Sequence, residues 1–213
     1  MARRIVVINP NSTDRITDSV REAVGDHPGV DVEVVTSSRG PAAIESDSDV
    51  AASVAPLLAT AANRFGDAYV VACFSDPGLD ELRAVSGVPC FGIAESAMRS
   101  AMVDGPVGVV SSVDDSIARH DRYWRRLGLD DHVVGDIAVG LGVLELDTDA
   151  AYAKVRRAAG QLVDAGAASV ILGCTGMTHM VDDLEAELGV RVVDPSRAAV
   201  TAAAQAVGVE STL

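Results

Sequence analysis

Two cysteines occupy equivalent places in two similar stretches of the chain. Cys73 follows the apolar run Ala68–Ala72, and Cys174 follows the similar run Ser169–Gly173. Each cysteine is therefore predicted to lie between a strand and a helix, where backbone N–H groups lower the pKa of a thiol and stabilise a developing oxyanion. Two such thiols on opposite sides of one carbon would form the acid–base pair that racemisation next to a carbonyl requires.

The remaining cysteine, Cys90, is predicted to be a core residue. The residue at the equivalent place in the second of the two similar stretches is Val192, which lies inside an apolar run. Three cysteines without a Cys-x-x-Cys pair fit neither a disulfide framework nor a structural zinc site, and the histidines show no metal-ligand spacing. The single lysine, Lys154, lies on the polar side of a predicted helix, which disfavours a pyridoxal phosphate Schiff base. We therefore expect neither a metal nor an organic cofactor.

Polar residues at two other strand ends are candidates for substrate contacts. Asn11 follows the first apolar run, and Ser111 and Ser112 follow the run Val107–Val110. Asn11 can point into a cleft, and the two serine hydroxyls can donate hydrogen bonds to a carbonyl oxygen. The alternative for all three is an ordinary role in a cap or a turn.

Two residues close to the cysteines could influence them. Asp76, three residues after Cys73, is predicted to be the N-cap of the next helix, with Pro77 in its first turn. His179, five residues after Cys174, could adjust the proton affinity of that thiol.

Eight short runs rich in valine and isoleucine alternate with helix-like segments. Continuous apolar strands that alternate with helices predict parallel sheets covered on both faces, so the fold class is α/β. The runs are Ile5–Ile8, Val30–Val35, Ala68–Ala72, Val88–Ile93, Val107–Val110, Val133–Ile137, Ser169–Leu172 and Val190–Val193.

The order of these runs repeats once along the chain. The corresponding positions 5 and 107, 73 and 174, and 87 and 189 are separated by 102, 101 and 102 residues. The nearly constant offset predicts two similar α/β lobes of about 100 residues, a common domain size. We place these lobes at residues 1–104 and 105–213, with a C-terminal helix that can cross over to the first lobe.

Charge and hydropathy argue against two kinds of partner. The formal net charge of −14 at pH 7 disfavours nucleic acids, whose binding requires clustered lysine and arginine. No apolar stretch approaches the roughly 20 residues that span a bilayer, and the run after Arg4 is too short for a signal peptide. We therefore expect a cytoplasmic protein with neither a nucleic acid nor a membrane as partner. Its expected partners are a small-molecule substrate and further copies of the same chain in a homo-oligomer.

Five segments resemble the aspartate/glutamate/hydantoin racemase superfamily, and most closely its hydantoin and allantoin racemase branch. The motifs Cys-Phe-x-Asp-Pro-Gly and Gly-Cys-x-Gly-Met are specific in combination. The segments, which extend over nearly the whole chain, are Ile8–Thr13, Gly40–Pro41 with Ile44–Glu45, Ala72–Leu79, Gly92–Glu95 and Leu172–Met177.

The resemblance implies two lobes related by a pseudo-two-fold axis, an active-site cleft between them, and no metal or organic cofactor. It also implies that Cys73 and Cys174 are the acid–base pair. Hydantoin racemases usually have alanine after the second cysteine, whereas this chain has Thr175, as in the amino-acid racemases of the superfamily. The resemblance therefore defines the reaction better than the substrate. The substrate contacts that it implies are Asn11, Phe74, Ser75, Ser111, Ser112, Thr175 and Gly176.

Three functions remain open at this point. The first is racemisation of a 5-substituted hydantoin or of allantoin, whose ring can be held by neutral groups such as Asn11 and Ser112. The absence of arginine from the motifs favours such a substrate over one with a carboxylate. The second is an aspartate/glutamate-type amino-acid racemase, or a related maleate isomerase or arylmalonate decarboxylase. The third is a non-catalytic small-molecule binding protein, which would tolerate the loss of either thiol.

Overall fold

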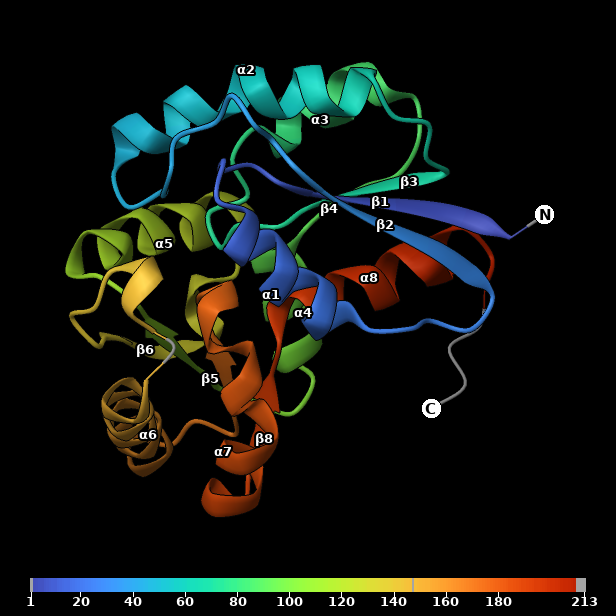
Figure 1. Ribbon diagram of the computed structural model, residues 1–213. Helices are drawn as coiled ribbons and strands as arrows, with labels where there is room; N and C mark the ends of the chain where they lie inside the picture. The colour runs from blue at the N-terminus through green and yellow to red at the C-terminus, as the bar shows by residue number, and fades with distance from the viewer. Residues whose placement is uncertain (1, 147, 210–213) are drawn as a thin grey trace. The chain divides into compact units, whose positions relative to one another are not determined.

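The computed structural model describes residues 2–146 and 148–209, and its eight described strands form two four-stranded parallel sheets (Figure 1). The strands are β1 (Arg3–Asn9), β2 (Val30–Thr36), β3 (Ala68–Val71), β4 (Cys90–Gly92), β5 (Val107–Ser111), β6 (Val133–Ala138), β7 (Ser169–Leu172) and β8 (Arg191–Val193). The α-helices are α1 (Asp14–Val24), α2 (Asp47–Ala62), α3 (Leu79–Ser86), α4 (Ile93–Ala101), α5 (Asp114–Leu127), α6 (Asp149–Asp164), α7 (Val181–Leu188) and α8 (Pro195–Ala206).

The predicted α/β fold and its eight strands are confirmed. One difference is at β4, which is expected from Val88 and begins at Cys90. Pro89 has no N–H group and cannot donate to the ladder, although its carbonyl still accepts the N–H of Tyr69 at 3.0 Å. Among the described residues, every helix is too short or too polar to cross a membrane.

The chain folds into two compact units. One comprises the chain up to Ser96 together with the part that begins at Ser196, and the other runs from Ala97 to Pro195. These units differ in extent from the ranges 1–104 and 105–213, because the second half of α4 belongs to the second unit. Helix α8, the C-terminal helix that was expected to be able to cross over, belongs to the first unit.

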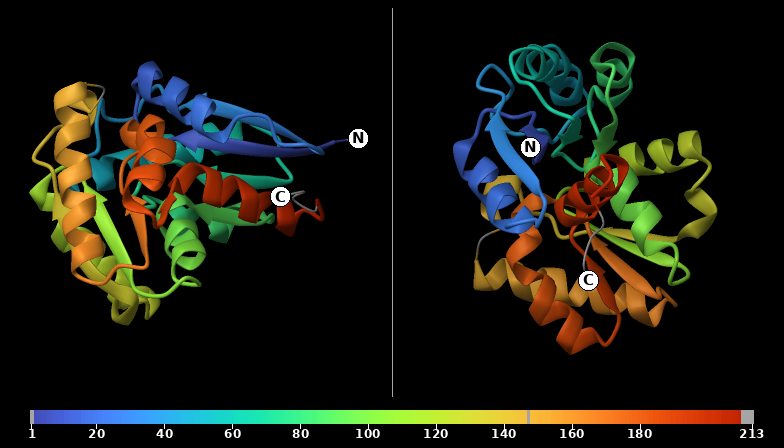
Figure 2. Two further views of the ribbon diagram at one scale, coloured as in Figure 1. Left: turned by 90° about the horizontal axis from the view of Figure 1, so that it is seen from below. Right: turned by 90° about the vertical axis from the view of Figure 1, so that its right-hand side faces the viewer.

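In the first unit, the strands lie in the order β2-β1-β3-β4 and all pairs are parallel. Val6 and Ile8 of β1 pack with Leu57 of α2 and Leu82 of α3. Helices α2 and α3 lie side by side over one face of the sheet, and α1 and α8 cover the other (Figures 1 and 2). Because both faces are covered, the central strand β1 is apolar at successive positions rather than at alternate ones.

The second unit has the strand order β6-β5-β7-β8, again with parallel pairs. Val110 of β5 and Leu172 of β7 share a core with Val155 and Leu162 of α6. A Cβ atom at Gly108 would lie 2.7 Å from the Cβ atom of Leu162, so glycine allows α6 to approach β5 closely. Helix α5 packs on β5 and β6.

Within each unit the parallel strands end at a common edge, where open α/β sheets bind ligands. In the first unit β1 and β3 are neighbours, so the segments that begin at Asn9 and Ala72 leave the sheet side by side. In the second unit β5 and β7 are neighbours, so Ser111 and Gly173 occupy the corresponding places. The fold therefore brings the predicted site residues of each unit to one sheet edge.

Candidate active site

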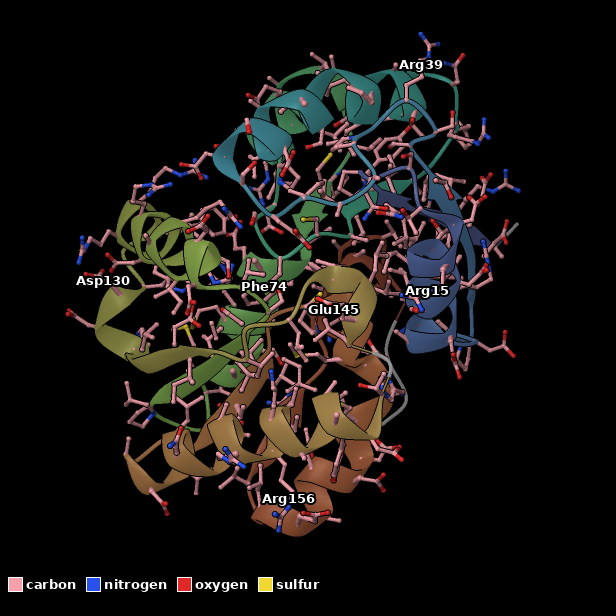
Figure 3. The ribbon with its side chains drawn as sticks, turned by 60° about the vertical axis from the view of Figure 1, so that its left-hand side comes forward. Arg15, Arg39, Phe74, Asp130, Glu145 and Arg156 are labelled. Carbon is pink, nitrogen blue, oxygen red and sulfur yellow. The ribbon has the colours of Figure 1, made fainter. Side chains whose placement is uncertain are left out.

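Cys73 lies in a tight turn directly after β3. The N–H of Ala72 still donates to the carbonyl of Ile8 at 2.9 Å, and the carbonyl of Cys73 then accepts the N–H groups of Ser75 and Asp76 at 2.8 and 2.9 Å. Cys73 is partly exposed, whereas Phe74 beside it is buried (Figure 3). The turn therefore leaves the thiol more accessible than the aromatic ring.

Asp76 caps a different helix from the one predicted. Helix α3 begins only at Leu79, and its N-cap is Gly78 with φ 71°. The Asp76 carboxylate instead accepts the backbone N–H groups of Ala94 and Glu95 at 3.0 and 2.9 Å, in the first turn of α4. The expected N-cap role in the next helix is wrong, because Asp76 adopts the left-handed conformation (φ 45°) and its side chain reaches a segment 18 residues away. Charge-assisted bonds of this kind fix the turn that carries Cys73 to the start of α4.

This contact gives a prediction about Gly92. A Cβ atom at that position would lie 2.1 Å from Cγ of Asp76, so we expect Gly92→Ala to lower the free energy of unfolding by about 1–3 kcal/mol. In an Asp76→Ala background the same change should cost much less, because the obstructing carboxylate is gone. Urea unfolding of the four proteins measures this coupling.

Gly160→Ala is the matched control for that cycle, because it lies inside α6 and its added Cβ would be 4.0 Å from the nearest atom, in Leu188. It should be neutral or stabilising, as alanine favours a helix more than glycine does. An equal cost of Gly92→Ala with and without the Asp76 carboxylate would show that the close contact is not the cause.

Cys174 lies closer to a helix start than Cys73 does. It is the N-cap of the 3₁₀ helix Thr175–Met180, which leads directly into α7, and its carbonyl accepts the N–H of Met177 at 3.0 Å. Gly173 donates its N–H to the carbonyl of Val110 at 2.8 Å, which joins this segment to β5. Cys174 is 8% exposed. The predicted helix-start environment therefore fits Cys174 better than Cys73, which precedes its helix by six residues.

Asn11 is held so that one of its polar groups remains available. Its Oδ1 accepts the N–H of Thr13 and the side-chain amide of buried Asn9, both at 2.9 Å. Within the described part of the chain, its Nδ2 group has no hydrogen-bond acceptor. Thr13 does not cap α1 with its side chain, because its hydroxyl donates to the carbonyl of Ala42 at 2.7 Å. Asn11 thus has a fixed orientation and an unused donor.

The two adjacent serines at the end of β5, Ser111 within the strand and Ser112 directly after it, differ from each other. Ser111 is fully buried and donates its hydroxyl proton to Oδ1 of Asp136 at 2.6 Å. A hydroxyl has one proton, so in this arrangement the expected donation from Ser111 to a substrate is replaced by an internal bond. Ser112 is 7% exposed, and its hydroxyl has no hydrogen-bond partner among the described residues. Ser112 is therefore the available donor of the pair.

The residues after Cys174 complete the second sheet edge. Thr175 is buried, and its hydroxyl makes no hydrogen bond to any described residue. Gly176 lies against the 3₁₀ helix Val143–Glu145, where a Cβ atom would be 3.1 Å from Leu146 and 3.3 Å from the carbonyl of Val143. His179, considered above as a modulator of Cys174, is exposed.

Cys90 is a core residue, as predicted. It is 6% exposed within the core of the first unit, and its thiol lies 3.0 Å from the hydroxyl of Ser86 and 3.4 Å from the carbonyl of Val88. Burial raises the pKa of the Cys90 thiol, against smaller opposing effects of Ser86 and Arg83. Cys90 therefore stays protonated at neutral pH.

Two polar residues near Ser111 were not predicted from the sequence as part of the site. His120 of α5 and Asp136 of β6 are both buried and both contact Ser111. A carboxylate inside the apolar run Val133–Ile137 was a visible signal, since an unpaired buried charge is unfavourable. Its partner could not be identified from the sequence, because it lies on a different element.

The chain resembles known proteins over almost its whole length. The profile of the Asp/Glu/Hydantoin racemase family matches residues 5–203. The hydantoin racemase of Paenarthrobacter aurescens is 35% identical over 206 residues, which cover 92% of this chain and 87% of the relative. That of Rhizobium meliloti is 32% identical over 213 residues, covering 96% and 88%. The structure of allantoin racemase from Klebsiella pneumoniae has a TM-score of 0.91 at 30% identity, covering 99% of this chain and 91% of that one.

A parallel α/β fold with cysteines at equivalent strand ends, together with these matches, defines a racemase. The chain belongs to the Asp/Glu/hydantoin racemase family. It is therefore an isomerase.

Proposed function

We propose that this racemase inverts the stereocentre of a 5-substituted hydantoin or of allantoin, with Cys73 and Cys174 as its two acid–base groups and without a cofactor. The observation that carries the proposal is the equivalence of the two cysteines. Each follows the strand that neighbours the first strand of its sheet, β3 beside β1 and β7 beside β5. The names of the two hydantoin racemases and of the allantoin racemase described above support the substrate class.

The reaction is a proton transfer without net oxidation or reduction. One cysteine, as thiolate, removes the proton from the ring carbon next to a carbonyl, and the electron pair of that C–H bond moves into an enolate-like intermediate. The other cysteine, as thiol, then donates a proton to the opposite face of the carbon. The mechanism requires that the two sulfur atoms face opposite sides of the planar intermediate. After one turnover their protonation states are exchanged, so the enzyme is ready for the other enantiomer.

The groups available at the strand ends suit a neutral ring. Asn11 offers an amide N–H, and Ser112 and Thr175 offer hydroxyls, none of which has a partner among the described residues. Neutral donors of this kind can bind ring carbonyls and stabilise negative charge on the enolate oxygen. A substrate with a carboxylate would instead call for an arginine that binds that carboxylate. The segments Asn9–Thr13, Cys73–Gly78, Ser111–Asp114 and Cys174–Met180 contain neither lysine nor arginine.

Arg39 does not change this argument. It follows β2 in the same unit as Cys73, but it is exposed and points outward (Figure 3). An amino-acid racemase would have to bind a free carboxylate, and an enzyme of the decarboxylase type would have to bind two. The donor set therefore favours the cyclic substrate.

A substrate panel in D2O tests this proposal. The enantiomers of several 5-substituted hydantoins and of allantoin, with aspartate and glutamate beside them, are incubated with the protein, and deuterium at the stereocentre is measured by NMR. We expect deuterium incorporation together with loss of optical rotation for one or more ring substrates, and neither change for the two amino acids. Samples without protein correct for spontaneous exchange of the acidic ring proton.

The same panel distinguishes the alternative functions. Exchange confined to aspartate or glutamate would replace the proposal by an amino-acid racemase. Binding of a hydantoin without any exchange would indicate a non-catalytic binding protein. Cys90→Ser is the control variant, since Cys90 lies in the core of the first unit and should leave the exchange rate unchanged.

A further inference from the structure

A buried cluster of Ser111, His120 and Asp136 joins three elements of the second unit. The Ser111 hydroxyl is 2.6 Å from Oδ1 of Asp136, and Nδ1 of His120 is 2.9 Å from Oδ2 of the same carboxylate. Nδ1 of His120 is also 3.2 Å from the Ser111 hydroxyl. Ser111 is 0% and His120 2% exposed, and the side chain of Asp136 is 8% exposed. One member of the cluster, Ser111, directly precedes Ser112 in the sequence.

The three distances fit the tautomer of His120 that carries its proton on Nδ1. An ionised carboxylate only accepts hydrogen bonds, so the Ser111 hydroxyl and the Nδ1–H of His120 both donate to Asp136. This is not the arrangement of a hydrolytic triad, in which one ring nitrogen faces the carboxylate and the other takes the proton of the serine. Here Nδ1 of His120 faces both the carboxylate of Asp136 and the hydroxyl of Ser111, and Ser111 is inaccessible to solvent. The cluster therefore orients groups rather than activating a nucleophile.

The backbone at this strand end is fixed by the loop after β6. The carbonyl of Ser111 accepts the N–H of Val139 at 2.9 Å, and the carbonyl of Ser112 accepts the N–H of Leu141 at 3.0 Å. The side chain of Lys154 donates in turn to the carbonyl of Val139 at 3.3 Å. The side chain and the main chain of Ser111 are thus both held, which sets the direction of the next residue.

The equivalent place in the first unit shows that this fold can form without a buried pair like His120 and Asp136. Asn9 lies 102 residues before Ser111, and its side-chain amide donates to the hydroxyl of Thr17 at 3.0 Å. Thr17 is joined in turn to Thr36 of β2 at 2.6 Å. Neutral groups therefore link the same three kinds of element there, and the carboxylate to which Thr36 also donates, that of Asp14, is exposed. A buried carboxylate is costly to desolvate, so its presence in the second unit calls for a role beyond linking the elements.

We propose that His120 and Asp136 are positioning residues that act through Ser111 to fix the Ser112 hydroxyl as the hydrogen-bond donor to the reacting carbonyl of the substrate. This inference rests on the racemase activity proposed above. A donor aimed at the oxygen that becomes negative contributes mainly to kcat, because the bond strengthens in the transition state. Loss of the cluster should therefore change kcat much more than KM.

A double-mutant cycle tests this role. Racemisation of the best ring substrate is measured for the wild-type protein, His120→Leu, Ser112→Ala and the double variant. Small errors in the placement of a donor lower rates by up to about 100-fold, so we expect His120→Leu to lower kcat by about 10-fold or more with KM nearly unchanged. In the Ser112→Ala background the same change should have little further effect. His120→Asn, whose side-chain amide can replace the Nδ1–H donor, should recover most of the rate.

Two further variants separate positioning from folding. Val155→Ala creates a cavity in the core of the second unit without touching the cluster, and it should lower stability while kcat remains near the wild-type value. If His120→Leu does not fold, Ser111→Ala takes its place in the cycle, since it removes only the link between the cluster and the strand end.

The outcomes are distinct. A wild-type kcat in the folded His120→Leu protein would overturn the inference, and so would an equal loss with and without Ser112, while the racemase proposal would stand. A wild-type protein that racemises no ring substrate would overturn the proposed function and the positioning role together.

Discussion

Replacing Cys73 or Cys174 singly by serine is expected to lower the rate of racemisation by about 10²–10⁴-fold in each variant, the usual contribution of one acid–base group. Serine keeps the size of the side chain and its capacity for hydrogen bonds, but its hydroxyl is a far weaker acid, and so it cannot supply a thiolate at neutral pH. Both losses should be of similar order, because inversion in either direction uses both groups once. Polarimetry with each pure enantiomer measures the rates.

Cys90→Ser is the matched control for these two variants. The hydroxyl can retain the contacts of the Cys90 thiol with Ser86 and Val88, and the side chain lies within the core of the first unit. Its racemisation rate should stay near the wild-type value. Near-wild-type rates in both Cys73→Ser and Cys174→Ser would contradict the two-cysteine mechanism, and a loss in only one of them would indicate a one-base enzyme.

Alkylation by iodoacetamide is expected to abolish activity almost completely, with modification at Cys73 first. The thiolate is the nucleophile in this reaction, and Cys73 is partly exposed, whereas Cys174 and Cys90 are 8% and 6% exposed. Burial raises the pKa of Cys90, so its thiolate forms only at a pH above the ordinary range for a thiol. Cys90 should therefore remain unmodified between pH 7 and 8 and react only in more alkaline solution.

Peptide mass spectrometry during inactivation checks this order. Loss of activity should follow modification of Cys73, and a saturating ring substrate should protect both Cys73 and Cys174. The Cys73→Ser variant should incorporate label much more slowly at the same pH. Modification of Cys90 in step with inactivation would show that the assignment of the core cysteine is wrong.

The regular part of the fold could be predicted from the sequence, because apolar runs of four to six residues that alternate with helical segments are typical of parallel strands in an α/β fold. The repeat of Ala68–Cys73 in Ser169–Cys174 further indicated two similar sheets. The exact start of β4 was missed. Pro89 has no N–H group for the strand ladder, yet it does not interrupt the apolar run from which the strand was predicted.

The long-range polar contacts could not be predicted. Asp76 has the local sequence of an N-cap, yet its carboxylate binds the first turn of α4, and only the folded chain brings that turn within reach. Ser111 likewise has the sequence of an ordinary turn residue, and its partners His120 and Asp136 lie 9 and 25 residues away. Local patterns carry information on secondary structure, whereas these bonds depend on which side chains become neighbours after packing.

The extent of the two compact units likewise depends on contacts between distant residues and not on local sequence patterns alone. The offset of 102 residues places a boundary near residue 104, but α4 belongs partly to the second unit. The C-terminal helix that was expected to be able to cross over is α8, which belongs to the first unit. Arg197 of α8 donates to the carbonyl of Ala23 at the end of α1, a contact between residues 174 positions apart. No local feature of the C-terminal segment indicates that contact, because an alanine-rich helix could pack on either sheet.

Deuterium exchange by the two single cysteine variants tests the central claim most directly. Each variant is incubated in D2O with each pure enantiomer of the ring substrate, and deuterium is measured separately in retained and inverted product. The remaining cysteine can still remove and return a proton on its own face, so each variant should introduce deuterium into one enantiomer without inverting it. Cys73→Ser and Cys174→Ser should prefer opposite enantiomers. Exchange of the same enantiomer by both variants, or inversion at a near-wild-type rate by either, would contradict the paired-cysteine mechanism.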